Sequence, residues 1–104
     1  MQENNKRSDL NSILVEGRIN DFELSKEQSK VFTFKIESSR VYRNNDNRIV
    51  EKLTYFTVNA SGLLVEHCRK KVKKGLKVLI VGRLESDENE FVIIKLEHIE
   101  FRNN

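Results

Sequence analysis

Two tyrosines flank a basic segment in the middle of this 104-residue chain. Tyr42 and Tyr55 enclose Arg43, Arg48 and Lys52. Aromatic rings offer faces on which bases can stack and cations neutralise phosphates, which are the two contributions that binding a single nucleic-acid strand requires. The segment therefore predicts a binding module rather than an enzyme.

Catalytic and metal-binding patterns are missing from the rest of the sequence. The four glycines form no phosphate-binding loop, and no nucleophile sits in a recognisable elbow. One cysteine, Cys68, and two histidines, His67 and His98, provide no ligand set for zinc. We therefore expect no enzymatic activity, no metal and no cofactor, and we interpret these three side chains as structural.

Charge and cysteine content indicate which ligands the protein can attract and in which cellular compartment it works. Lys and Arg outnumber Asp and Glu by 19 to 16, so attraction for an anion depends on where the cations cluster. The polar N-terminus lacks the apolar core of a signal peptide, and no run approaches the roughly 20 apolar residues of a membrane span. A lone cysteine excludes an intramolecular disulfide. These features predict a cytoplasmic, nucleoid-associated protein with no membrane contact.

Hydrophobic patterning predicts one domain over residues 12–104, preceded by a flexible polar segment over residues 1–11. Alternation or β-branched runs predict five strands, over residues 12–19, 31–38, 53–60, 77–84 and 91–101. Gly17 predicts a bulge or a sharp bend in the first strand. In the last strand the apolar phase changes, which predicts a bulge near Glu97 and His98. The fourth strand is nearly all apolar and is expected to be covered on both faces.

A helix is predicted between the third and fourth strands. Leu64, Cys68 and Val72 lie four residues apart on one stripe, and Gly75 follows as a stop signal. Five strands with one helix in this position are the order of an all-β, five-stranded Greek-key barrel of the OB-fold type, which binds oligonucleotides across its second and third strands. Alternation assigns one set of apolar side chains to the barrel core instead of to base stacking: Phe32, Phe34, Ile36, Phe56 and Val58.

Four sequence blocks resemble the bacterial single-stranded DNA-binding proteins. They are NSILVEGRI, IESSRVYR, GLLVEHCRKKVKKG and VLIVGRL, and they occur in the family's order within residues 11–84. The resemblance implies an OB-fold, sequence-tolerant binding of single-stranded DNA in replication, repair or recombination, and a homo-oligomer, usually a tetramer. It also implies that Tyr42 and Tyr55 occupy the places of base-stacking aromatics and that Arg43 matches the basic residue beside the first of them.

The chain also departs from that family. It has no tryptophan, and Ser61 stands where many members carry another aromatic. Asp21-Phe22 replaces the usual Asp-Pro, and a short acidic turn over residues 85–90 replaces a long aromatic hairpin. The sequence ends at Asn104 without an acidic tail, so we do not expect protein recruitment of the kind that the tail serves.

The predicted interface combines stacking at Tyr42 and Tyr55 with phosphate neutralisation by seven cations. These cations are Arg18, Lys35, Arg40, Arg43, Arg48, Lys52 and Arg83. The run Arg69, Lys70, Lys71, Lys73 and Lys74 has two interpretations, a path for phosphates or a solvated helix end that favours cations.

Two alternatives to this function stay open. A primosome accessory protein similar to primosomal replication protein N shares the fold and a comparable length; its dimeric form would distinguish it by mass in solution. An OB-fold protein-interaction module that has lost DNA binding would bind no oligonucleotide.

Overall fold

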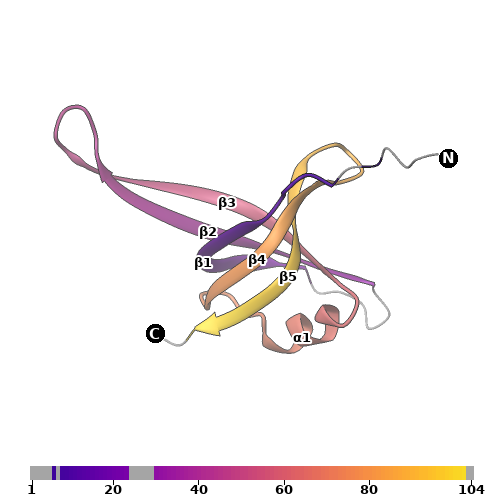
Figure 1. Ribbon diagram of the computed structural model, residues 1–104. Helices are drawn as coiled ribbons and strands as arrows, with labels where there is room; N and C mark the ends of the chain where they lie inside the picture. The colour runs from indigo at the N-terminus through magenta and orange to yellow at the C-terminus, as the bar shows by residue number, and fades with distance from the viewer. Residues whose placement is uncertain (1–5, 7, 24–29, 103–104) are drawn as a thin grey trace.

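The computed structural model describes residues 6, 8–23 and 30–102 and contains a five-stranded barrel with one helix (Figure 1). The elements are β1 (Ile13–Phe22), β2 (Val31–Arg43), β3 (Ile49–Ser61), α1 (Leu64–Lys71), β4 (Lys77–Ser86) and β5 (Val92–Arg102). Most of the predicted flexible segment 1–11 lies outside the described residues. At its end, the Asn11 amide exchanges two hydrogen bonds with the backbone of Leu84.

The strands close in the order β1-β2-β3-β5-β4. Antiparallel pairing joins β1 to both β2 and β4, and a short parallel contact at Val58–Ile94 and Asn59–Lys95 joins β3 to β5. This closed barrel, with one helix between β3 and β4, confirms the predicted OB-fold. No described helix has the length and apolar character to cross a bilayer.

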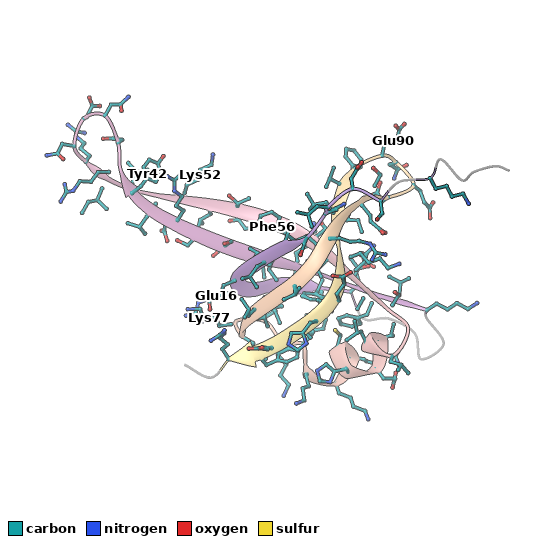
Figure 2. All side chains as sticks on the ribbon, in the orientation of Figure 1. Glu16, Tyr42, Lys52, Phe56, Lys77 and Glu90 are labelled. Atoms are coloured by element: carbon teal, nitrogen blue, oxygen red, sulfur yellow. The ribbon has the colours of Figure 1, made fainter. Side chains whose placement is uncertain are left out.

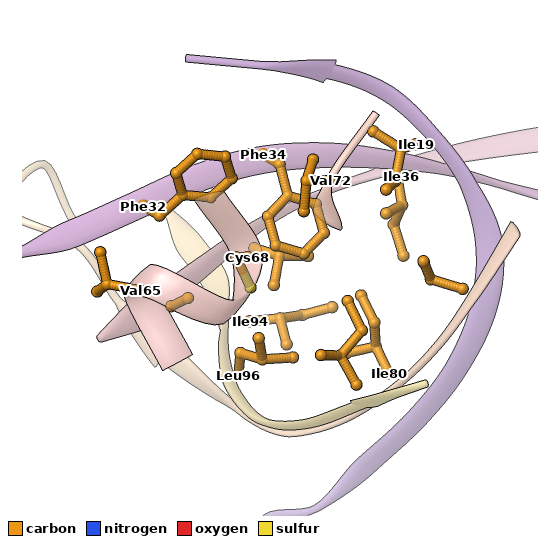
Figure 3. Close-up of a cluster of buried hydrophobic side chains, with 14 residues drawn as sticks. Ile19, Phe32, Phe34, Ile36, Val65, Cys68, Val72, Ile80, Ile94 and Leu96 are labelled. Atoms are coloured by element: carbon orange, nitrogen blue, oxygen red, sulfur yellow. The ribbon is translucent and has the colours of Figure 1, made fainter. Parts of the chain in front are cut away.

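Alternating side chains fill the barrel, and α1 covers one end of it (Figure 3). Phe32, Phe34 and Ile36 of β2 are fully buried with Val58 of β3, as predicted, whereas Phe56 is only half-buried. The helix contributes Val65 and Cys68 to the same cluster, and Val72, directly after the helix, joins them. Burial raises the pKa of the Cys68 thiol to about 11, so at neutral pH it is a protonated apolar side chain in the core.

Of the two predicted features at Gly17, a bulge or a sharp bend, the bulge does not form there. The ladder between β1 and β2 shifts between Ile19 and Asp21 instead, where Asn20 is the extra residue. Gly17 is needed for a close approach of two strands, because a Cβ atom there would lie 2.6 Å from the carbonyl oxygen of Glu37. The isolated glycine does mark a special position of the backbone, but what it allows is the close approach of β1 to β2.

The second predicted bulge is confirmed. Val81 pairs with His98 and Gly82 pairs with Leu96, which leaves Glu97 as the extra residue of β5. The inserted residue changes the phase of the strand, so Leu96 and Ile99 both face the core.

Two finer predictions were wrong: that both faces of β4 are covered, and that Gly75 ends the helix. β4 is central, but Leu79 and Val81 on its outer face are only half-buried. Helix α1 ends at Lys71 with Val72 in extended conformation, and Gly75, at φ +89°, forms the turn into β4. That left-handed turn lets the Gly75 amide donate to the Ile19 carbonyl.

Replacing Gly17 with Ala should destabilise the barrel. The added methyl group meets backbone atoms that cannot rotate away, so the free energy of unfolding should fall by about 1–3 kcal/mol, the usual cost of overpacking. Urea denaturation followed by circular dichroism measures this change. Asn20→Ala, at an exposed position of the same strand, serves as the control and should stay within about 0.5 kcal/mol of the unchanged chain. Equal stability of the two variants would show that the strands do not approach this closely.

Candidate nucleic-acid interface

The β2–β3 hairpin extends beyond the barrel as a two-stranded arm, which we define as residues 38–54 (Figure 1). β1 pairs with β2 only up to Glu37, and β5 pairs with β3 only at Val58 and Asn59. Along the arm, both outer strand edges therefore have no partner strand among the described residues. The predicted basic loop lies at the tip of this arm.

One unbroken register sets the direction of every side chain on the arm. All pairs from Val31–Ser61 to Arg43–Ile49 are in register, with no bulge. Because side chains alternate between the two faces of a strand, even-numbered residues continue the core-facing side of the barrel and odd-numbered residues continue its outer side. We call these the inner and outer faces of the arm.

The inner face of the arm carries Tyr42 with two of the predicted cations. The Arg40 guanidinium carbon lies 4.6 Å from the centre of the Tyr42 ring, a cation–π contact that covers one side of the ring. Lys52 is the cross-strand partner of Arg40, and Figure 2 shows it near Tyr42 on the arm. A base could stack on the side of the Tyr42 ring that Arg40 leaves open.

The outer face carries Tyr55, whose side chain is 56% exposed. Its cross-strand partner is Glu37, and a hydrogen bond to that carboxylate, reinforced by its negative charge, raises the pKa of the Tyr55 phenol. Lys35 lies diagonally across from Tyr55 on the same face, and Arg43 lies on this face near the tip. Tyr42 and Tyr55 thus lie on opposite faces of the arm and do not form one continuous stacking surface.

Hydrogen bonds between side chains and backbone groups hold the turn at the tip of the arm. The Asn44 side-chain oxygen accepts from the amides of Asp46 and Arg48, and Arg43 Nη1 donates to the Asn47 carbonyl at 3.1 Å. Asn47 adopts φ +62°, a conformation that asparagine tolerates. This turn leaves the Arg48 side chain exposed at the end of the arm.

The remaining two predicted cations, Arg18 and Arg83, lie on the barrel. Arg18 donates to the Gly75 carbonyl at 3.2 Å. Arg83 binds the carboxylates of Glu85 and Glu97 at 2.7 and 3.0 Å, and the Glu85 contact is the main cause of its raised pKa. The structure therefore gathers eight of the nine predicted residues on the arm or beside its base, because Arg18 is paired with Glu37 across the β1–β2 ladder, and it leaves Arg83 elsewhere on the barrel.

Comparison with known proteins agrees with this architecture. Residues 10–91 match the model of the single-strand binding protein family. The chain belongs to that family. The match covers most of the sequence, so the resemblance inferred from four short blocks is confirmed.

Solved structures of single-strand binding proteins share the fold. The Plasmodium falciparum protein in complex with single-stranded DNA has a TM-score of 0.78 at 21% identity, over 94% of this chain and 99% of that one. The small Streptomyces coelicolor protein has a TM-score of 0.67 at 19% identity, over 88% and 92%. The second Mycobacterium smegmatis protein has a TM-score of 0.67 at 24% identity, over 88% and 87%. No curated protein sequence matches the chain.

Within this family framework, sequence reasoning missed three exposed apolar residues on the outer face of the arm. Val41, Ile49 and Leu53 are 65%, 68% and 40% exposed. The register makes Ile49 and Leu53 the two diagonal neighbours of Val41, and Leu53 is two residues from Tyr55, so the four side chains form one apolar stripe. Extending the alternation of β2 past Ser38 would have placed Val41 on this face.

The Glu37 contact makes a testable prediction for Tyr55. In a Tyr42→Phe background Tyr55 is the last remaining tyrosine, and its ionisation can be followed by ultraviolet absorbance because the chain has no tryptophan. Adding Glu37→Gln removes the negative charge, so the pKa of Tyr55 should fall toward its ordinary value of 10.0. Glu51→Gln is the control: this carboxylate on the same face is bonded to Ser39, so the substitution should leave the pKa raised. The same pKa with and without Glu37 would contradict the contact.

Proposed function

We propose that this protein binds single-stranded DNA with little sequence preference and serves replication, repair or recombination. The proposal rests on a difference between the cations of the arm and those of the barrel. Within the described residues, four arm cations have no carboxylate within 4.0 Å, whereas several barrel cations are paired with acids. The unpaired cations are Arg40, Arg43, Arg48 and Lys52. A cation without an acidic partner can neutralise a phosphate without breaking an ion pair first. Membership of the single-strand binding protein family supports the same role.

The two faces of the arm suggest how one strand is held. On the inner face, a base stacks on the open side of Tyr42 while Arg40 and Lys52 neutralise neighbouring phosphates. On the outer face, Tyr55 and the apolar stripe offer surfaces to bases and sugars, and Lys35 and Arg43 meet phosphates. We infer that the strand contacts both faces and passes Arg48 at the tip.

The barrel cations have a smaller part in this proposal. Arg83 already binds two carboxylates, and Arg18 lines a groove that also contains Glu16, Glu37 and Glu51. Three carboxylates close together repel phosphates, so Arg18 and Arg83 rank below the arm cations as contacts.

We further propose that the chain forms a homo-oligomer in the cytoplasm, as a tetramer or a dimer. Leu14 is 70% exposed on the outer face of β1, directly opposite Val81 of β4. Leu79 continues this apolar surface, which a second copy could cover. The mass of the protein in solution distinguishes a tetramer from a dimer.

Fluorescence anisotropy of a labelled oligothymidine tests the proposed binding. The protein should prefer the single strand over a duplex of equal length, and the affinity should fall as salt rises because bound cations release counterions. Two salt concentrations are enough to establish the slope. Absent binding, or equal weak binding to both forms, would refute the proposal and favour an OB-fold that contacts proteins.

Truncating either tyrosine should weaken binding without unfolding the chain. Tyr42→Ala and Tyr55→Ala each remove a ring, at an expected cost of about 1–3 kcal/mol of binding free energy. Tyr42→Phe and Tyr55→Phe keep the ring and serve as matched controls, with affinities expected near that of the unchanged protein. A loss at one tyrosine alone would restrict the strand to one face of the arm.

A further inference from the structure

A polar groove of about 240 Å³ lies on the outer face of the molecule, where the arm joins the barrel. Side chains from four strands line it, and they carry both signs of charge: Glu16, Arg18, Glu37, Ser39, Glu51 and Lys77. Lys77 Nζ lies 3.6 Å from Glu16, so these two charges are paired (Figure 2). The binding proposed for the arm gives the other carboxylates of this groove no role.

Two of these carboxylates keep acceptor sites for an external ligand. Glu37 and Glu51 have no cation within 4.0 Å in the part of the chain that the structure describes. Their hydrogen-bond donors are hydroxyl groups: Ser39 donates to Glu51 at 2.6 Å, and the Tyr55 phenol donates to Glu37. A carboxylate has about four lone-pair sites, so each retains room for further N–H donors.

Arg18 supplies a donor directly beside Glu37. The two residues are cross-strand partners in the ladder between β1 and β2. Arg18 Nη1 donates to the Gly75 carbonyl at 3.2 Å, which holds one end of the guanidinium in place. Because a guanidinium has five N–H donors and no described carboxylate lies within 4.0 Å of this one, the others are available. Arg18 and Glu37 thus present a donor and an acceptor side by side.

This combination suits a nucleobase better than a phosphate. Three carboxylates around the groove repel a phosphate, whereas a base is uncharged and carries donors and acceptors along its edge. The volume is below the roughly 300–1,000 Å³ typical of ligand pockets, which favours a single base. Tyr55 stands next to the groove, because Glu37 both lines it and accepts from the Tyr55 phenol. A base stacked on Tyr55 would bring its neighbour in the strand to the groove.

We propose that this groove binds the edge of one guanine, with Glu37 accepting from N1–H and the exocyclic amino group while Arg18 donates to O6. Guanine offers a carboxylate two adjacent N–H groups, and two parallel charge-assisted hydrogen bonds are stronger than one. The inference rests on the proposed function and refines it. A strand that is bound with little preference elsewhere acquires a preference at one position.

Fluorescence anisotropy with labelled strands of about 35 nucleotides, long enough to fill an OB-fold, tests this preference. One strand is oligothymidine, and in three others every fifth thymine is replaced by guanine, hypoxanthine or cytosine. The guanine strand should bind about fivefold more tightly than oligothymidine, at the lower end of the discrimination that a bidentate contact provides. Hypoxanthine is a purine that keeps O6 and N1–H but lacks the amino group, so it should lose most of this gain. An equal gain with hypoxanthine or with cytosine would overturn the proposal.

Two variants of the groove locate the contact. Glu37→Gln removes one acceptor, so the ratio of the affinities for the guanine strand and for oligothymidine should fall close to one. Glu51→Gln removes the same charge from the same groove, and as the matched control it should keep the ratio. A ratio that survives Glu37→Gln, or that both variants lose equally, would show that Glu37 does not bind the base. Arg18→Gln should lower the ratio independently, and circular dichroism establishes that each variant is folded.

The remaining outcomes separate this inference from the proposed function. If the unchanged protein binds none of the strands, both are wrong. If it binds oligothymidine and gains nothing from guanine, the proposed function stands and the guanine contact alone is wrong.

Discussion

The continuous ladder between β2 and β3 is the constraint on which the rest of the structure depends. It runs without a bulge from the barrel interior to the tip of the arm, so the residues that fill the core also fix the direction of every arm side chain. A slip of one residue would turn the core side chains of one strand outward, Phe34 in β2 or Val58 in β3, and would move the arm side chains of that strand to the opposite face. Core packing therefore specifies the geometry of the interface, although residues 38–54 contribute no side chain to the hydrophobic core cluster.

Charge is distributed differently on the barrel and on the arm. On the barrel, Glu16 lies near Lys77 and Arg102, and Arg83 lies between two glutamates. Such exposed pairs add little stability, but they reduce the net field of the barrel surface. The arm has few acids, and four of its cations, Arg40, Arg43, Arg48 and Lys52, have no carboxylate within 4.0 Å among the described residues. A net charge of only +3 is therefore compatible with a concentrated positive surface, because position matters more than the total.

The sequence predicted the barrel well because alternation and phase are read locally. The change of phase between Leu96 and Ile99 predicted a bulge near Glu97 and His98 without any knowledge of the partner strand, and the extra residue is Glu97. The role of Gly17 was harder to predict, because an isolated glycine indicates that the backbone needs a glycine there without indicating why. The requirement here is set by the carbonyl of Glu37, twenty positions away in the sequence. Long-range contacts of this kind are not visible in a local pattern.

The interface was predicted less completely than the fold, for a related reason. Tyr42 and Tyr55 flank a basic segment in the sequence, but their relation in space depends on the register, which no single strand reveals. Once the pairs Tyr42–Val50 and Glu37–Tyr55 are known, the tyrosines fall on opposite faces and Val41 joins Tyr55.

The exposure of that apolar stripe also has a structural benefit. A two-stranded ribbon is at best marginally stable in water, and β-branched residues such as Val41 and Ile49 favour the extended conformation. These side chains strengthen the ladder of the free arm and, in doing so, leave an apolar surface uncovered on one face. A bound strand that covers this surface would stabilise the arm further, so binding and the order of the arm would reinforce each other. The chemistry of the stripe thus links the stability of the hairpin to the function proposed for it.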